Sequence, residues 1–197
     1  MAVDYGILRE NLRQFYDFCD KAVLYVGAGG RQLLDPAIKT KRLIAIDQNA
    51  LLLEELKASV AADARANVEV MAARFEDVSI SADVVYFEFC LHEMNDPEEA
   101  LRRARRLAAD TVVFDHMVGS EWIFLGAEED KVRRSATAIE QFGFRRRERF
   151  LLAQQFSDHN ELLAKLNGQG ALAIERAQRF AGATDISIPM PYELILL

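Results

Sequence analysis

The strongest constraint on the fold of this chain is the alternation of short apolar runs with helical runs along most of its length. The apolar runs have the length and composition of buried strands, and they cover residues 22–27 (AVLYVG), 42–47 (RLIAID), 68–73 (VEVMAA), 82–91 (ADVVYFEFCL) and 111–116 (TVVFDH). Runs with helical periodicity lie between them, as at 48–64 and 95–110. This alternation predicts an α/β fold with a doubly wound parallel sheet and right-handed crossovers.

Helical segments are also expected before, within and after this region. Apolar spacing predicts an N-terminal helix within residues 1–20 and a short helix at 32–38 that Pro36 cuts or bends. Towards the C-terminus the pattern predicts a helix at 128–144 closed by Gly143, a strand at 145–156, helices at 159–166 and 170–180, and a last strand at 192–197. We therefore expect a single domain over residues 1–197, with a helical insertion at 156–186 before the last strand.

Composition and charge limit the expected partners and compartment. The formal net charge of -7 disfavours a nucleic-acid partner, whose phosphates require a basic surface, and we interpret the basic clusters at 102–106 and 145–147 as solvated faces. Cys19 and Cys90 show neither a metal-binding spacing nor a disulfide framework. No stretch approaches the roughly 20 apolar residues of a membrane span, and the N-terminus does not resemble a signal peptide. These features predict a cytoplasmic protein with no membrane partner.

A glycine-rich loop follows the first expected strand, at residues 27–30 (GAGG). Ligands of open parallel sheets bind beyond the carboxyl ends of the strands, where the strand order reverses, and glycines let them approach the main chain. Asp47 ends the second strand and follows Gly27 at about the twenty-residue offset of a carboxylate that holds ribose hydroxyls. The alternative interpretation is that Asp47 only caps the helix beginning near Asn49.

Two classes of adenosine-containing cofactor use such a layout. A dinucleotide site usually requires the pattern G-x-G-x-x-G, whose third glycine permits close packing of the helix near the pyrophosphate. That third position is Gln32 in this chain. The sequence therefore disfavours a nicotinamide-dependent oxidoreductase, which we keep as the less favoured alternative.

The chain resembles the class I S-adenosylmethionine-dependent methyltransferases, of the type that acts on small molecules. The resemblance is carried by VLYVGAGG as the cofactor loop, AIDQN as the acidic end of the second strand, and DVVYFEFCLHEMNDPEEALRRARRLA as the fourth strand with its loop and helix. It covers residues 22–144 well. It implies a Rossmann-like methyltransferase fold, with a seven-stranded, mostly parallel sheet and an antiparallel last strand inserted between its neighbours.

The resemblance also implies how S-adenosylmethionine would be held. The amino-acid tail of the cofactor would lie over the glycine loop, with its ammonium near main-chain carbonyls; Asp47 would bind the ribose. Gln48 and Phe75 would flank the adenine, although Phe75 has an equal alternative as a core residue. The expected cofactor-binding residues are Gly27, Ala28, Gly29, Asp47, Gln48, Phe75 and Phe87.

Three positions depart from the pattern of the family. An acid is usual two residues before the first glycine, where this chain has Tyr25, and a further glycine is usual at Arg31. The acid usual in the adenine-binding stretch is replaced by Arg74. These departures motivate a second hypothesis, a non-catalytic domain of the same fold that binds the cofactor or a partner.

Residues suited to catalysis follow the fourth and fifth strands. His92 and Glu93 come after the fourth strand, and Asp115 and His116 end the fifth, so all four are expected at the carboxyl edge of the sheet. Methyl transfer is a direct displacement that needs a general base only if the acceptor must lose a proton, and histidine suits that role. We expect His92, His116 and Glu93 to be catalytic. A metal site formed by these four residues is conceivable, but no ligand spacing enforces one, and no metal is expected.

The leading hypothesis is therefore an enzyme that transfers a methyl group from S-adenosylmethionine to a small organic acceptor. The loop after the fourth strand lacks the N-P-P-Y signature of amino-methylating DNA enzymes. Neither the identity of the acceptor nor the oligomeric state can be read from the sequence.

Overall fold

In the computed structural model, which describes residues 4–35, 37–63 and 65–197, seven strands form a single sheet in the order β3-β2-β1-β4-β5-β7-β6. The strands are β1 (Ala22–Val26), β2 (Arg42–Asp47), β3 (Val68–Ala72), β4 (Val84–Glu88), β5 (Asp110–His116), β6 (Arg146–Asp158) and β7 (Thr184–Leu196). The pairs from β3 to β5 are parallel, and β7 is antiparallel to both β5 and β6. This topology confirms the predicted doubly wound fold and the antiparallel last strand between its neighbours.

The strand order reverses at β1, which pairs with β2 on one side and with β4 on the other. Val26, the last residue of β1, lies opposite Ile46 of β2 and Phe87 of β4. The residues that follow these three positions are Gly27, Asp47 and Glu88, so they emerge side by side at the carboxyl edge of the sheet. This is the edge where ligands of open α/β sheets bind.

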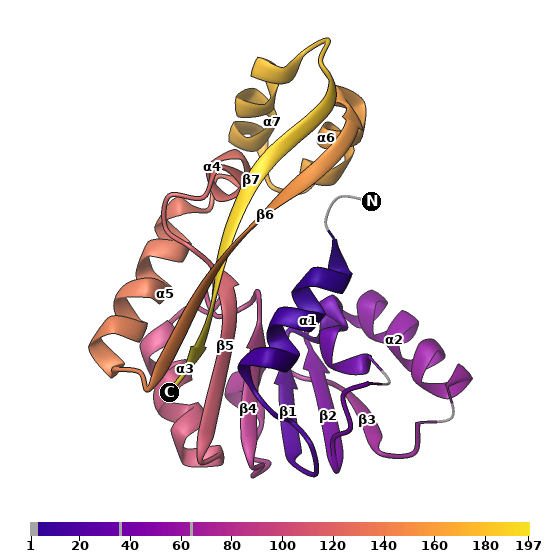
Figure 1. Ribbon diagram of the computed structural model, residues 1–197, viewed down its shortest axis with the longest axis vertical. Coiled ribbons are helices and arrows are strands. Elements are labelled where there is room, and N and C mark those ends of the chain that lie inside the picture. The colour runs from indigo at the N-terminus through magenta and orange to yellow at the C-terminus, as the bar shows by residue number, and fades with distance from the viewer. Residues whose placement is uncertain (1–3, 36, 64) are drawn as a thin grey trace.

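Helices cover both faces of the sheet (Figure 1). They are α1 (Tyr5–Phe15), α2 (Ala50–Ala62), α3 (Pro97–Leu107), α4 (Glu121–Gly126), α5 (Glu129–Phe142), α6 (His159–Leu166) and α7 (Ala171–Ala177). Apolar residues of α1 and α2 share a core with inward side chains such as Tyr25 and Tyr86, whereas α3 and α5 pack on the opposite face against Val85 and Phe87. Successive strand residues point to opposite faces, so near-continuous apolar strands supply both cores.

The helix predicted at 32–38 is wrong. The chain after β1 forms two single turns of 3-10 helix, Ala28–Gly30 and Gln32–Leu34, separated by Arg31 in the left-handed region with φ +63°. A left-handed residue interrupts a right-handed helix, and a residue before proline, here Asp35, is biased towards extended backbone. Pro36 itself lies outside the described residues. The N-terminal helix α1 packs against this segment and covers the sheet beside it.

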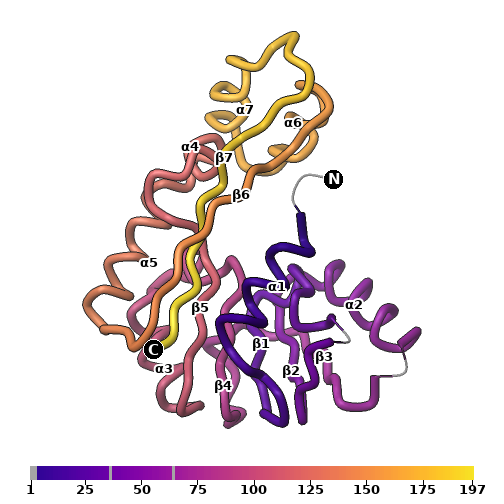
Figure 2. Tube along the Cα trace, in the orientation of Figure 1, coloured from indigo at the N-terminus to yellow at the C-terminus, as the bar shows by residue number. Residues whose placement is uncertain are grey.

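Strands β6 and β7 continue past the end of β5 and form a long two-stranded arm (Figures 1 and 2). β7 pairs with β5 only from Tyr192 to Leu196, whereas its earlier residues pair with β6 alone. Helices α6 and α7 lie at the tip around a small separate core that includes Phe156 and Ile186. The two predicted helices are confirmed, but the strands run into the predicted insertion, to Asp158 and from Thr184.

The last strand is longer than predicted and includes Pro189 and Pro191. In the arm, β7 pairs with β6 along one edge only, and its other edge has no neighbouring strand in the described part of the chain. A proline, which has no N–H to donate, is tolerated where its backbone nitrogen faces that unpaired edge. The short helix α4, which begins at Ser120 as N-cap, was not predicted. Among the described residues, no helix has the length and apolar character needed to cross a membrane.

Candidate functional site

A cavity of about 480 Å³ lies at the carboxyl edge of β1, β2 and β4. It is lined by Val26, Gly27, Ile46, Asp47, Gln48, Ala73, Arg74, Phe75, Glu76, Cys90, Glu93, Met94 and Asn95. The cavity therefore opens where the strand order reverses, as expected from the glycine loop. Its size is within the range of small-molecule and cofactor sites.

Four of the predicted cofactor-binding residues line this cavity: Gly27, Asp47, Gln48 and Phe75. Phe75 is also a core residue, because its ring packs edge-to-face on Phe87 at 5.1 Å, whereas its contact with the adenine stays a prediction.

The other three predicted residues are not among those that line the cavity. Ala28 and Phe87 are fully buried, and Gly29 lies over α2, where an added side chain would come within 3.0 Å of Leu52 and 3.7 Å of the Asp47 carboxylate. These residues shape the loop beneath and beside the cavity.

Asp47 is not the cap of α2. Asn49 is the N-cap, and its side-chain oxygen accepts hydrogen bonds from the N–H groups of Leu51 and Leu52 at 3.1 and 3.4 Å. Asp47 Oδ1 accepts a hydrogen bond from Asn49 N–H at 2.8 Å, which orients the carboxylate at the wall of the cavity. The capping interpretation of Asp47 is therefore wrong, and its carboxylate remains available to a ligand.

The glycine loop requires glycine at two positions for different reasons. Gly27 has φ +75°, and a Cβ there would lie 2.7 Å from Cys90 Sγ. At Gly30 a Cβ would lie 1.6 Å from Glu88 Oε1, so a buried carboxylate fills the space that a side chain would need. The loop is thus folded closely over the ends of β1 and β4.

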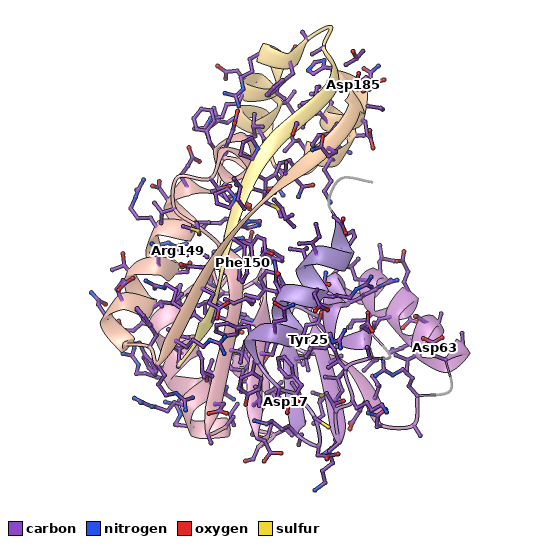
Figure 3. The ribbon with its side chains drawn as sticks, viewed as in Figure 1. Asp17, Tyr25, Asp63, Arg149, Phe150 and Asp185 are labelled. Carbon is purple, nitrogen blue, oxygen red and sulfur yellow. The ribbon has the colours of Figure 1, made fainter. Side chains whose placement is uncertain are left out.

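Glu88 is a buried acid that the sequence analysis did not single out. The Tyr25 hydroxyl donates a hydrogen bond to Glu88 Oε2, the Tyr86 hydroxyl lies 3.4 Å from the same oxygen, and Glu88 Oε1 has no hydrogen-bond partner among the described residues. Tyr25 lies on β1, and its side chain is fully buried in the core (Figure 3). Burial raises the pKa of Glu88 to about 8, although the hydrogen bond from Tyr25 opposes this. The sequence does contain a signal that could have identified Glu88, because it is an acid at the end of the most apolar strand.

The predicted catalytic residues converge beside the cavity. His92 Nδ1 lies 2.5 Å from Asp115 Oδ1, and the main-chain N–H of His92 donates to Asp115 Oδ2 at 3.0 Å. The rings of His92 and His116 are 5.5 Å apart between centroids, and Glu93 Oε1 lies 3.5 Å from His92 Nε2. Adjacent strand ends thus bring together the four residues that the sequence pointed to.

Two further members of this cluster were not predicted. Glu128, the residue before α5, places Oε2 4.0 Å from His92 Nε2, and Lys131 Nζ donates to Glu93 Oε2 at 2.7 Å and to Glu128 Oε1 at 3.1 Å. Both lie in a segment whose sequence is that of an ordinary charged helix start, so no local sequence pattern identifies them as functional residues.

The environments of the two histidines move their pKa values in opposite directions. Burial alone would lower the pKa of His92, but Asp115 and Glu93 more than offset it and raise the pKa to about 10. Burial lowers the pKa of His116 to about 4, and its Nδ1 is buried without a hydrogen-bond partner among the described residues. One ring is therefore positively charged at neutral pH and the other is neutral.

The strand order and the ligand-sized cavity at the switch point define a Rossmann-like fold of the methyltransferase type. The sequence model of a family described as "Methyltransferase domain" matches residues 24–113, which run from β1 to β5 and contain the glycine loop, Asp47 and His92. Residues 24–113 are therefore similar to a methyltransferase domain, in agreement with the resemblance to the class I S-adenosylmethionine-dependent methyltransferases. The family implies S-adenosylmethionine as the cofactor.

Solved structures share this fold over nearly the whole chain. The YcgJ protein of Bacillus subtilis is 14% identical with a TM-score of 0.72, and the match covers 98% of this chain and 96% of that one. A SAM-dependent methyltransferase from Aquifex aeolicus is 16% identical with a TM-score of 0.60, and the match covers 99% and 89%.

A structure described as a precorrin 8w decarboxylase, from Methanobacterium thermoautotrophicum, also shares the fold. It is 12% identical with a TM-score of 0.60, and the match covers 96% and 88%. At these identities the likeness shows the fold alone. No curated protein matches the sequence.

Proposed function

We propose that residues 1–197 act as a single methyltransferase-like domain that transfers the methyl group of S-adenosylmethionine to a small-molecule acceptor. The observation that carries the proposal is the cavity at the switch point, which Gly27, Asp47 and Phe75 line together. Asp47 binds the ribose hydroxyls, because a carboxylate can accept two charge-assisted hydrogen bonds from a diol. Gln48 and Phe75 flank the adenine, and the amino-acid tail lies over residues 27–29, near the carbonyls of Gly27 and Phe87.

The enzyme contributes mainly alignment of the acceptor with the methyl group and exclusion of water. Where the acceptor must lose a proton, His116 acts as the general base. It is neutral at physiological pH, and its ring lies against Phe89 at 4.5 Å, beside the loop that leaves β4. His92 is a positioning residue in this proposal, because Asp115 and Glu93 hold it in the charged form.

A small acceptor is favoured over a nucleic acid because arginines of the two basic clusters, 102–106 and 145–147, are already paired within the protein. Within 102–106, Arg102 pairs with Glu98 and Glu99, and Arg103 donates to the carbonyl of Phe75 at 3.1 Å. Within 145–147, each arginine contacts a carboxylate. Guanidinium groups engaged in this way contribute little to phosphate binding. We also propose a cytoplasmic location, since Cys19 and Cys90 are both free.

The proposal is tested by incubating the protein with methyl-labelled S-adenosylmethionine and separate small-molecule, nucleic-acid and protein fractions. Label is expected in the small-molecule fraction, lost in Asp47→Asn and kept in Asp17→Asn. Asp17 is a matched control because its Oδ1 accepts from the N–H two residues on at 2.8 Å, as Asp47 does, but it lies near the opposite edge of the sheet (Figure 3). Label in a polymer fraction would reject the small acceptor.

The non-catalytic hypothesis makes a different prediction for the same experiment. It requires that no label is transferred to any fraction, and S-adenosylhomocysteine binds only if the domain retains the cofactor rather than a partner. The loop favours the cofactor over NAD, since Gln32 is buried where a dinucleotide site has glycine.

A further inference from the structure

One cluster beside the cavity contains more ligand atoms than the proposed methyl transfer uses. His92 follows β4, Glu93 is its neighbour, and Glu128 precedes α5. His92 is 3% exposed, the Glu128 side chain 11% and the Glu93 side chain 43%, so the cluster is buried on one side and open at Glu93. We propose that His92 Nε2, Glu93 Oε1 and Glu128 Oε2 bind a divalent transition-metal ion.

The distances between the ligand atoms are close to those around a single ion. His92 Nε2 lies 3.5 Å from Glu93 Oε1 and 4.0 Å from Glu128 Oε2, and the ligand atoms of the three residues all lie within 4.8 Å of one another. Nitrogen and carboxylate ligands sit about 2.0–2.2 Å from such ions, so two of them on one ion are at most about 4.4 Å apart. Small rotations of the two glutamates would complete the site.

Lys131 does not occupy the atoms that would bind the ion. Its ammonium donates to Glu93 Oε2 and Glu128 Oε1, whereas the oxygens that lie 3.5 and 4.0 Å from His92 Nε2 are Glu93 Oε1 and Glu128 Oε2. The remaining oxygen of each glutamate therefore faces Nε2 of the imidazole. Lys131 holds both carboxylates in the orientation that a metal site requires.

His92 is likewise oriented by a carboxylate, which contacts the ring nitrogen that would not bind the ion. Asp115, which is buried, lies 2.5 Å from His92 Nδ1 and also accepts the His92 main-chain N–H. Histidine ligands of metal ions ordinarily give their second nitrogen to a carboxylate or carbonyl, which fixes the ring and leaves the first nitrogen to the ion. Each of the three ligands thus has an outer partner on the side away from the proposed ion.

The charge of the cluster also favours a cation. Glu93, Glu128 and Asp115 are three acidic groups that face His92, and Lys131 pairs with Glu93 and Glu128. The ion would replace the proton that His92 Nε2 carries in the metal-free protein, so binding releases that proton to solvent. Buried carboxylates are stable only when they are paired or coordinate a metal. A set of one imidazole and two carboxylates suits Mn²⁺, Fe²⁺ or Zn²⁺ better than Mg²⁺ or Ca²⁺, which prefer oxygen ligands alone.

The ion would lie at the border of the cofactor cavity. Glu93 lines that cavity as well as the cluster. Three protein ligands leave coordination positions open, and these would face the side where Glu93 is exposed. An oxygen or nitrogen atom of the acceptor would be the natural occupant of such a position. This inference goes beyond the proposed function and does not depend on it.

The test is a calorimetric titration of Mn²⁺ into the full chain after dialysis against a chelator. One ion per chain is expected, with affinity at least tenfold lower in Glu128→Gln and in Glu93→Gln. Glu93 is half-exposed, so its substitution should leave the fold intact. Glu140→Gln is the matched control, because Glu140 is also on α5 but pairs with Arg147. Mg²⁺ is expected to bind more weakly than Mn²⁺.

A second readout identifies the nitrogen ligand. The paramagnetic resonance spectrum of the Mn²⁺-loaded protein should show coupling to one ¹⁴N nucleus, and His92→Gln should abolish it. The inference is overturned by any of three results: no Mn²⁺ binding, Mn²⁺ binding unchanged in both glutamate variants, or Mg²⁺ binding as tightly as Mn²⁺. Because these readouts measure metal binding without turnover, they separate this inference from the failure of the methyltransferase proposal.

Discussion

The Tyr25 hydroxyl of β1 donates a hydrogen bond to the buried carboxylate of Glu88 at the end of β4, directly beneath the glycine loop. Members of the resembled family usually carry an acid at the position of Tyr25. In this chain the neighbouring strand β4 places the acid Glu88 beside the Tyr25 hydroxyl instead.

Glu88 should make the stability of the protein fall as the pH rises. Its pKa is raised from 4.5 to about 8, so the folded state holds a proton that the unfolded state releases above pH 4.5. The free energy of unfolding should decrease between pH 4.5 and 8, by an amount on the order of 3–5 kcal/mol if the whole shift is expressed. Denaturant unfolding of Glu88→Gln should lack this component. Equal pH dependence in both proteins would show that Glu88 is ionised in the fold.

Gly30→Ala should destabilise the protein through a collision with Glu88. The added Cβ would lie 1.6 Å from Glu88 Oε1, and overpacking of this kind costs about 1–3 kcal/mol. Gly126→Ala is the control, since the nearest atom to its added Cβ is 3.6 Å away and it lies in α4, where alanine is favoured.

The collision can be checked in a double-mutant cycle. Glu88→Ala removes the colliding carboxylate, so Gly30→Ala should cost at least about 1 kcal/mol less in that background. Additive effects of the two substitutions would place the strain elsewhere in the loop.

His116→Gln should slow methyl transfer without weakening cofactor binding. Loss of a general base lowers the rate about 10²–10⁴-fold, whereas the affinity for S-adenosylhomocysteine should change less than threefold. Because burial lowers the pKa of His116 to about 4, the activity of the unsubstituted enzyme should stay level from pH 8 to 6 and fall only near pH 4. An acidic limb with an apparent pKa near 6.5, or full activity in the variant, would contradict the assignment.

Arg176→Ala should loosen the tip of the arm. The Arg176 guanidinium donates to Glu129 at 2.7 Å and to the carbonyl of Phe124, and it stacks over the Phe124 ring at 4.0 Å, so it joins α7 to α4 and α5. Hydrogen exchange should accelerate in residues 159–180 of the variant. Arg133→Ala, which removes an exposed pair with Asp130, should have no such effect. Unchanged hydrogen-exchange protection of residues 159–180 in Arg176→Ala would contradict this prediction and mean that the small core at the tip is sufficient to keep α6 and α7 in place.

The sequence predicted the sheet and its edge well because the central strands β1, β2, β4 and β5 are near-continuous apolar runs. That pattern led correctly from Val26 to Gly27, from Ile46 to Asp47, and from the ends of β4 and β5 to His92 and Asp115. Parallel pairing alone then brings these side chains to one edge. The helix predicted at 32–38 is only a single 3-10 turn, Gln32–Leu34, because the backbone is already extended at Asp35, the residue before Pro36.

The residues that the sequence did not reveal act through contacts between distant segments. Glu128 and Lys131 lie at the start of a helix whose sequence is that of a solvated charged face. Glu128 approaches His92, and Lys131 binds Glu93, only because α5 packs beside α3 in the folded chain. Glu88 lies in the run 82–91, which the sequence analysis interpreted only as a buried strand, so it was not considered as a functional residue. Its role depends on Tyr25 and Gly30, which lie 63 and 58 positions away.

The central claim, that the cavity at the end of β1 binds S-adenosylmethionine through Asp47, is tested most directly by calorimetric titration of S-adenosylhomocysteine. We expect micromolar-range binding to the unsubstituted chain and to Asp17→Asn, at least tenfold weaker binding to Asp47→Asn because each charge-assisted hydrogen bond to the ribose is worth about 1.5–3 kcal/mol, and no tight binding of NAD. Equal affinity of Asp47→Asn and Asp17→Asn for S-adenosylhomocysteine, or tight binding of NAD in its place, would contradict the account.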